Sequence, residues 1–156
     1  MIGQQHDLAV EAFVRLLRAH AALTRRLSAQ LQAEHGLTIN DYEALLLLSR
    51  AEERRMRRVD LAATLLLTAS GVTRLLDGLE AGGFVERVLC DVDRRVAYAR
   101  LTDAGAARLR AASESHVAAV RSLLESHLRP EELEQLAELL GRLPGTGGAG
   151  AETCRP

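Results

Sequence analysis

Lysine and tryptophan are absent from the 156 residues, and aromatic side chains make up only 3% of them. The core must therefore be built from leucine, valine and alanine, which favours packed helices over an aromatic-rich β-sandwich. Only two cysteines occur, Cys90 and Cys154, and their wide separation argues against a zinc finger or a disulfide framework. There is no run of 18 apolar residues and no signal-peptide pattern at the N-terminus, so we expect a cytoplasmic protein without a membrane span.

Arginine supplies all 20 basic residues, while the formal net charge is only -1. The guanidinium group binds phosphate and guanine through a bidentate fork that lysine cannot form. A compositional bias of the genome explains the missing lysine more readily than a function does. The placement of the arginines is therefore more informative than their number.

The spacing of apolar residues and the capping residues predict six helices. These are expected over residues 7–34, from the Thr38–Asp41 capping box to about Ser49, from about Val59, from the N-cap Thr68 to about Ala81, from Thr102-Asp103, and from Pro130 to about Leu143. Two β-prone runs, Phe84–Leu89 and Val96–Leu101, flank a polar turn and predict a hairpin. The charged segment 50–58 is assigned no regular structure. This order predicts a mainly α fold with a small β-hairpin wing, the winged helix-turn-helix.

The helix that begins after Thr68 is the predicted recognition helix, because it immediately precedes the hairpin. Its first turn offers Thr68, Ser70, Thr73 and Arg74 to DNA, and the small Gly71 allows a close approach of the backbone. An ordinary amphipathic helix with a solvated Arg74 would show the same pattern, so this helix alone does not decide the function.

The hairpin turn places Asp93, Arg94 and Arg95 where nothing needs to be buried. An arginine on a protruding turn can enter a narrow minor groove, where the negative potential is enhanced. Asp93 lies two residues from Arg95 and is positioned to hold its guanidinium. A merely solvated charged turn is the alternative, which the spacing from the predicted recognition helix disfavours.

Several segments, in order from about Leu37 to Leu109, resemble the MarR family of bacterial transcription regulators. They are Leu61-Ala62, Val72–Asp77, Leu79-Glu80, Gly83–Arg87, Asp93–Arg95, and Leu101-Thr102 with Gly105. The resemblance implies a dimerisation helix over 1–36, a DNA-binding domain over 37–101, C-terminal dimerisation helices over 102–143 and a flexible tail over 144–156. It also implies that Thr68, Ser70, Thr73 and Arg74 contact the major groove or its phosphates, and that Arg95 enters the minor groove.

Two features depart from that family pattern. Leu66 occupies a turn position where glycine is common, and the third helix follows an arginine-rich segment instead of a polar cap. The arginines of this segment either contact phosphates or form a solvated loop; they are Arg54, Arg55, Arg57 and Arg58.

The sequence therefore predicts a homodimeric regulator, a repressor of a near-palindromic operator, whose partners are double-stranded DNA and a phenolic or other aromatic effector. The effector-binding residues are not identified. The histidines form no metal motif and no nucleophile–base pair is visible, so we expect no enzyme activity, cofactor or metal. Two alternatives remain: a protein-interaction module that has lost DNA binding, and an oxidant sensor that acts through Cys90.

Overall fold

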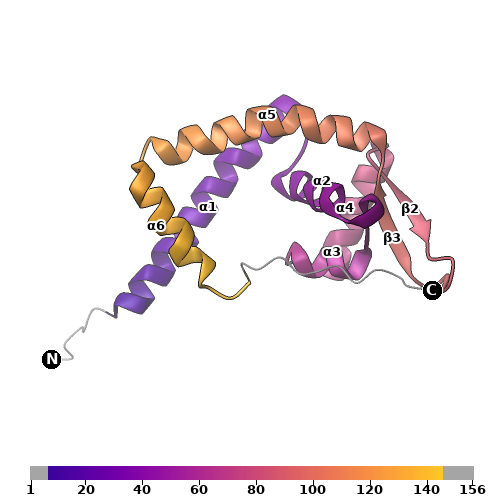
Figure 1. The fold of residues 1–156 in the computed structure, drawn as a ribbon, viewed down its shortest axis with the longest axis horizontal. Helices are drawn as coiled ribbons and strands as arrows, with labels where there is room; N and C mark the ends of the chain where they lie inside the picture. The colour runs from indigo at the N-terminus through magenta and orange to yellow at the C-terminus, as the bar shows by residue number, and fades with distance from the viewer. Residues whose placement is uncertain (1–6, 146–156) are drawn as a thin grey trace.

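The computed structural model describes residues 7–145, in which six helices and a small sheet form a lobe and an arm (Figure 1). The helices are α1 (Leu8–His35), α2 (Ile39–Arg50), α3 (Arg58–Thr64), α4 (Ala69–Ala81), α5 (Asp103–Glu125) and α6 (Pro130–Gly141). The strands are β1 (Arg55–Arg57), β2 (Val85–Leu89) and β3 (Ala97–Leu101), and a 3-10 turn covers Glu52–Arg54. Helices α2, α3 and α4 gather with the sheet at one end, while α1, α5 and α6 extend away from them.

The helix starts lie where the capping residues place them. Thr38 accepts the Asp41 N–H at 3.1 Å, and the Asp41 carboxylate accepts the Thr38 N–H at 2.8 Å, which completes the capping box. Thr68 and Thr102 cap α4 and α5 through their hydroxyls. The predicted mainly α fold with a hairpin wing is confirmed. Helix α6 ends two residues earlier than expected, at Gly141, and of the predicted tail only residues 144–145 are described.

The charged segment is more regular than the sequence indicated. Its residues 55–57 form β1, which pairs antiparallel with β3 and makes a three-stranded sheet in the order β1-β3-β2. Met56 is 5% exposed, while the Arg55 guanidinium lies 5.0 Å from the centre of the Tyr98 ring. The assignment of this segment to irregular structure was wrong, because a three-residue strand with one apolar side chain has no recognisable periodicity.

Leucine side chains of α2, α3 and α4 form the core of the lobe. Leu45, Leu48 and Leu61 are fully buried, and Leu76 is 1% exposed. By contrast, α6 has no buried residue and α1 buries only Leu31. Within residues 7–145 no single helix is long and apolar enough to cross a membrane, although α3 and α4 satisfy that test as a pair bent by 109°.

The first turn of α5 lies directly against the entry to β2. The Thr102 hydroxyl donates to the Gly83 carbonyl at 2.6 Å, and the Thr102 N–H donates to the Phe84 carbonyl at 3.1 Å. A Cβ atom on Gly105 would lie 2.0 Å from that same Phe84 oxygen. Only glycine fits at position 105 without a shift of the backbone.

We expect Gly105→Ala to destabilise the protein by at least about 1–3 kcal/mol, because the added methyl group overlaps a backbone oxygen that cannot move independently. Gly78→Ala is the matched control: no atom lies within 4 Å of its added Cβ, and alanine should stabilise α4 by about 0.5–1 kcal/mol. Urea unfolding monitored by circular dichroism measures both. Equal unfolding midpoints for the two variants would contradict the close contact.

Candidate nucleic-acid interface

Helices α3 and α4 meet at 109° across the short connection 65–68, which lies within the range of helix-turn-helix motifs. Leu66 has φ +54° in this connection and its side chain is 90% exposed. The backbone therefore keeps the left-handed conformation that favours glycine, even though the residue is leucine. The leucine at position 66 therefore does not prevent the left-handed conformation of this turn.

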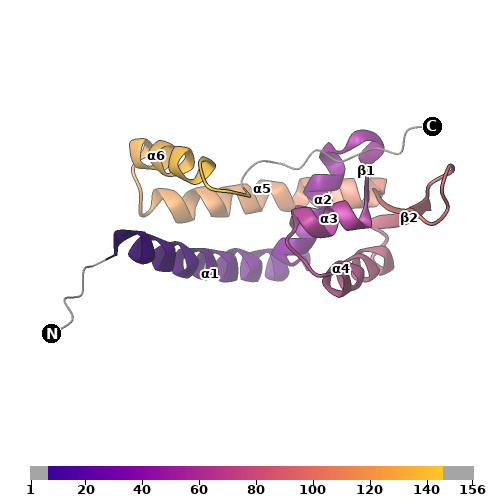
Figure 2. The same ribbon diagram turned by 90° about the horizontal axis from the view of Figure 1, so that it is seen from below.

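The predicted recognition helix α4 buries one face and exposes the other. Val72, Leu76 and Leu79 are 1–4% exposed and pack into the core. On the opposite side the predicted DNA-contacting side chains lie in solvent; they are Thr68, Ser70, Thr73 and Arg74. In Figure 2, α4 lies along one edge of the lobe and the hairpin projects from its end.

The Thr68 and Gly71 positions also shape the start of α4. Thr68 accepts the Gly71 N–H at 3.1 Å, and its hydroxyl lies 3.2 Å from that of Ser70. A Cβ atom on Gly71 would lie 3.1 Å from the Thr68 hydroxyl and 3.6 Å from Leu67. Glycine at position 71 therefore avoids a close contact with the Thr68 hydroxyl that caps the helix.

The hairpin tip holds Arg95 through Asp93. A turn from Asp93 to Val96 is closed by the Val96 N–H at 2.9 Å, which places Arg94 and Arg95 at its corners. The Asp93 carboxylate accepts the Arg95 N–H at 3.0 Å and its Nε at 3.2 Å. The Arg95 side chain is nevertheless 92% exposed. Asp93 thus fixes the backbone turn and the Nε of Arg95, while the side chain as a whole stays accessible.

The arginines of the charged segment divide into two groups. Arg54 forms an ion pair with Asp103 at 3.3 Å, and Arg57 donates to both oxygens of Asp60, at 2.7 and 3.1 Å. Arg58 instead donates to the hydroxyl of Thr73 at 3.2 Å. That hydroxyl in turn donates to the Ala69 carbonyl at 2.9 Å. Arg58 therefore joins the exposed face of α4, a link that no local sequence pattern indicates.

A hollow of about 270 Å³ connects the helix-turn-helix with the wing. Arg57, Arg58 and Val59 line it from the start of α3, and Arg95, Val96 and Ala97 line it from the hairpin. Since Arg58 also contacts Thr73, the recognition helix, the hollow and the wing form one continuous surface.

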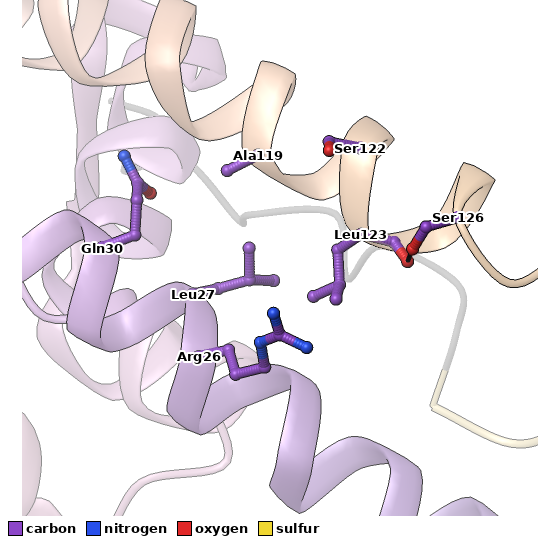
Figure 3. Close-up of a pocket in the computed structure, with 7 residues that line it drawn as sticks. All are labelled: Arg26, Leu27, Gln30, Ala119, Ser122, Leu123 and Ser126. Carbon is purple, nitrogen blue, oxygen red and sulfur yellow. Dashed lines mark hydrogen bonds between the residues drawn. The ribbon is translucent and has the colours of Figure 1, made fainter.

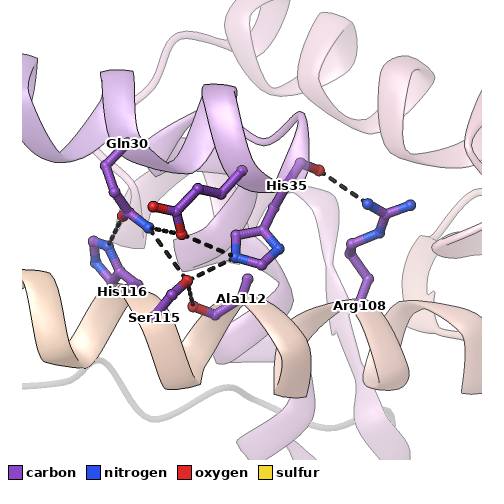
Figure 4. A network of polar contacts seen from close by, with 7 residues as sticks. Gln30, His35, Arg108, Ala112, Ser115 and His116 are labelled. Carbon is purple, nitrogen blue, oxygen red and sulfur yellow. Dashed lines mark hydrogen bonds and ion pairs between the residues drawn. The ribbon is translucent and has the colours of Figure 1, made fainter.

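A second polar cluster lies between α1 and α5 (Figure 4). His116 is 8% exposed; its ring centre lies 4.5 Å from that of Tyr42, and its Nδ1 lies 3.4 Å from the Gln30 amide oxygen. Burial lowers the pKa of His116, which favours the neutral form of its ring. Nearby, the Ser115 hydroxyl lies 2.7 Å from His35 Nε2, and Gln30 donates to Ser115 at 3.2 Å. The cluster satisfies polar groups at the inner surface of the arm.

The arm also contains a hollow of about 310 Å³ between α1 and α5 (Figure 3). Its apolar lining consists of Leu27, Ala119 and Leu123, and its polar lining of Arg26, Gln30, Ser122 and Ser126.

No three His, Cys, Asp or Glu side chains among residues 7–145 are placed to hold a metal ion.

Cys90 lies at the base of the hairpin and is 3% exposed. Its N–H donates to the Val96 carbonyl at 3.0 Å. The other cysteine, Cys154, lies outside the described residues. A buried sulfur does not present the accessible thiolate that an oxidant attacks, which disfavours the oxidant-sensor hypothesis.

Comparison with known proteins gives a consistent result. A family model described as MarR family matches residues 35–96. The HTH-type transcriptional repressor YetL of Bacillus subtilis is 32% identical over 111 residues, which cover 71% of this chain and 66% of that protein.

Two solved structures from Streptomyces coelicolor are similar over most of the chain. AbsC, a MarR family transcriptional regulator, is 36% identical with a TM-score of 0.76, covering 86% of this chain and 90% of that one. Sco3205, a MarR family regulator solved in complex with DNA, is 32% identical with a TM-score of 0.76, covering 83% and 81% of the two chains.

Proposed function

Because the chain belongs to the MarR family of transcriptional regulators, we propose that it is a repressor that binds its operator as a homodimer and is released by a small molecule. One observation carries the DNA-binding part of this proposal. The exposed face of α4 and the Arg95 turn belong to one surface, joined through the Arg58–Thr73 contact and the hollow beside it. The relatives regulate transcription, and we propose no catalytic role for this chain.

In this proposal α4 contacts the major groove and the hairpin turn contacts the minor groove. The first turn of α4 presents Thr68, Ser70, Thr73 and Arg74 to the edges and phosphates of the major groove, while Gly71 adds no bulk. The Asp93-held Arg95, with Arg94 beside it, enters the minor groove, where an arginine is attracted by the narrow A·T-rich tracts.

We expect Arg74→Ala and Arg95→Ala each to weaken binding to the specific operator by about 1–3 kcal/mol for each lost contact. Gel-shift titration of the DNA that flanks the gene, at moderate salt, measures this. Arg121→Ala is the control, since Arg121 lies on α5 and its side chain is 68% exposed. Failure of the wild-type protein to shift this DNA specifically would contradict operator binding and favour an interaction module.

The arm of the protomer is incompletely packed, which supports a homodimer. Large apolar side chains that are 37–76% exposed occur on all three of its helices; they are Leu8, Val10, Phe13, Val14, Leu16 and Leu17 on α1, Val117 on α5, and Leu136 and Leu139 on α6. Monomeric proteins rarely expose apolar patches of this kind. A second copy of the same arm offers a matching apolar surface, and a two-fold pair would present two recognition helices to successive major grooves.

We expect the double variant Phe13→Glu, Leu17→Glu to be monomeric, because the two residues lie one turn apart on α1 and are 60% and 52% exposed. Size-exclusion chromatography with light scattering measures the mass. Leu66→Glu is the matched control, since Leu66 is 90% exposed on the lobe and should leave a dimer intact. A dimeric double variant would place the interface elsewhere.

The α1–α5 hollow is the proposed effector site. Its apolar walls fit an aromatic ring, and Arg26 supplies a positive charge for a phenolate or carboxylate. Occupation of the hollow changes the distance between the recognition helices only if the ligand binds one arrangement of the arm more tightly than the other.

We expect benzoate and phenol, used as probes, to release the wild-type protein from its DNA, and Arg26→Ala to lose the response to benzoate. Arg25→Ala is the control, because the neighbouring Arg25 lines a different surface of α1. Fluorescence anisotropy of a labelled duplex measures release. Equal responses of the two variants would show that this hollow is not the site.

A further inference from the structure

The hollow between α3 and the wing combines positive charge with an apolar floor. Arg58 and Arg95 lie on its two sides, and Val59, Val96 and Ala97 supply apolar surface. Val59 is 67% exposed, so its side chain is accessible at the hollow. Among the described residues that line the hollow, none is acidic.

Among the described residues, Arg58 is the arginine of the hollow that has no carboxylate partner. Arg57 is already engaged by both oxygens of Asp60, and Arg95 is held through Nε by Asp93. Within residues 7–145, the only hydrogen bond of the Arg58 guanidinium is to the neutral Thr73 hydroxyl. Its charge therefore faces the hollow without a carboxylate to balance it.

A sugar–phosphate unit of DNA has the complementary chemistry. Its phosphodiester carries one negative charge, and its oxygens accept hydrogen bonds from a planar guanidinium. The carbon atoms of the deoxyribose can contact apolar side chains. The hollow also lies between the two elements proposed to enter adjacent grooves, and the strand that separates a major from a minor groove must pass between those elements.

We propose that this hollow is the binding site of one DNA backbone phosphate, which Arg58 binds. The Thr73 hydroxyl positions the Arg58 guanidinium beside the recognition helix. The inference rests on the proposed function, since it concerns how the same surface holds DNA. The contact fixes the register of the protein on the duplex and carries no sequence information. A free inorganic phosphate ion would offer Arg58 a similar negative group, so the test distinguishes a DNA phosphate from a free anion.

The test compares Arg58→Gln, Arg58→Lys and the control Arg54→Gln by fluorescence anisotropy over a series of salt concentrations. Glutamine keeps a donor for Thr73 and part of the stem but removes the charge, whereas lysine keeps the charge. Arg54 belongs to the same charged segment but does not line the hollow. Two labelled duplexes of equal length are used, the DNA that flanks the gene and an unrelated sequence.

We expect Arg58→Gln to lower the affinity for both duplexes by the same factor and to reduce the slope of log K against log salt by about 1 per protomer. Arg58→Lys should keep most of the slope, and Arg54→Gln should leave it unchanged. Thermal unfolding of each variant confirms that the fold persists.

The contrary outcomes are distinct. If the wild-type protein binds neither duplex, the proposed function fails and this inference fails with it. If DNA is bound but Arg58→Gln keeps the wild-type slope of log K against log salt, only the proposed phosphate-binding site is wrong. If titration calorimetry shows that inorganic phosphate binds in an Arg58-dependent manner while the DNA slope is unchanged, the hollow is a free-anion site and the DNA contact is overturned.

Discussion

The close contact between α5 and the entry to the wing is the constraint on which the arrangement of lobe and arm depends. The Phe84 carbonyl accepts the Thr102 N–H and lies where a side chain on residue 105 would be, so the helix start and the strand start are fixed to each other. Arg108 strengthens the same junction: its guanidinium lies 4.9 Å from the centre of the Phe84 ring and donates to the His35 carbonyl at 3.0 Å. These contacts join the start of α5 to both the end of α1 and the start of the wing.

That rigidity gives the proposed effector a physical means of acting on DNA. Gln30 lines the α1–α5 hollow and also contacts Ser115, which lies 2.7 Å from His35. The His35 carbonyl is the group that Arg108 holds at the junction (Figure 4). These contacts are contiguous from the hollow to the wing. Contiguity alone transmits nothing, but two arrangements of the arm would place the recognition helices at different distances.

The sequence predicted most of the fold because local signals and tertiary packing agree. Thr38, Thr68 and Thr102 cap helices at the predicted positions, since a side-chain acceptor at a helix start acts over three residues only. Strand β1 and the Arg58–Thr73 contact were missed for the opposite reason. The strand exists only because β3, more than 40 residues later, offers it a partner, and Arg58 meets Thr73 only after the chain has turned between α3 and α4. At Leu66 the residue type alone does not indicate the left-handed backbone, although the position is one where the family often has glycine.

The near-neutral net charge, which motivated the alternative of a pure interaction module, does not describe the surface that would meet DNA. The structure neutralises its arginines unequally: Arg54 is paired with Asp103 and Arg57 with Asp60. Arg58 contacts a neutral hydroxyl, whereas Arg95 forms an ion pair with Asp93 through Nε and its side chain stays exposed. Charges that are paired within the protein contribute little to the field at a phosphate, whereas a guanidinium group without a carboxylate partner, such as that of Arg58, contributes more at short range. A protein with a net charge of -1 can thus still carry an unpaired positive charge, that of Arg58, beside the proposed DNA-binding surface.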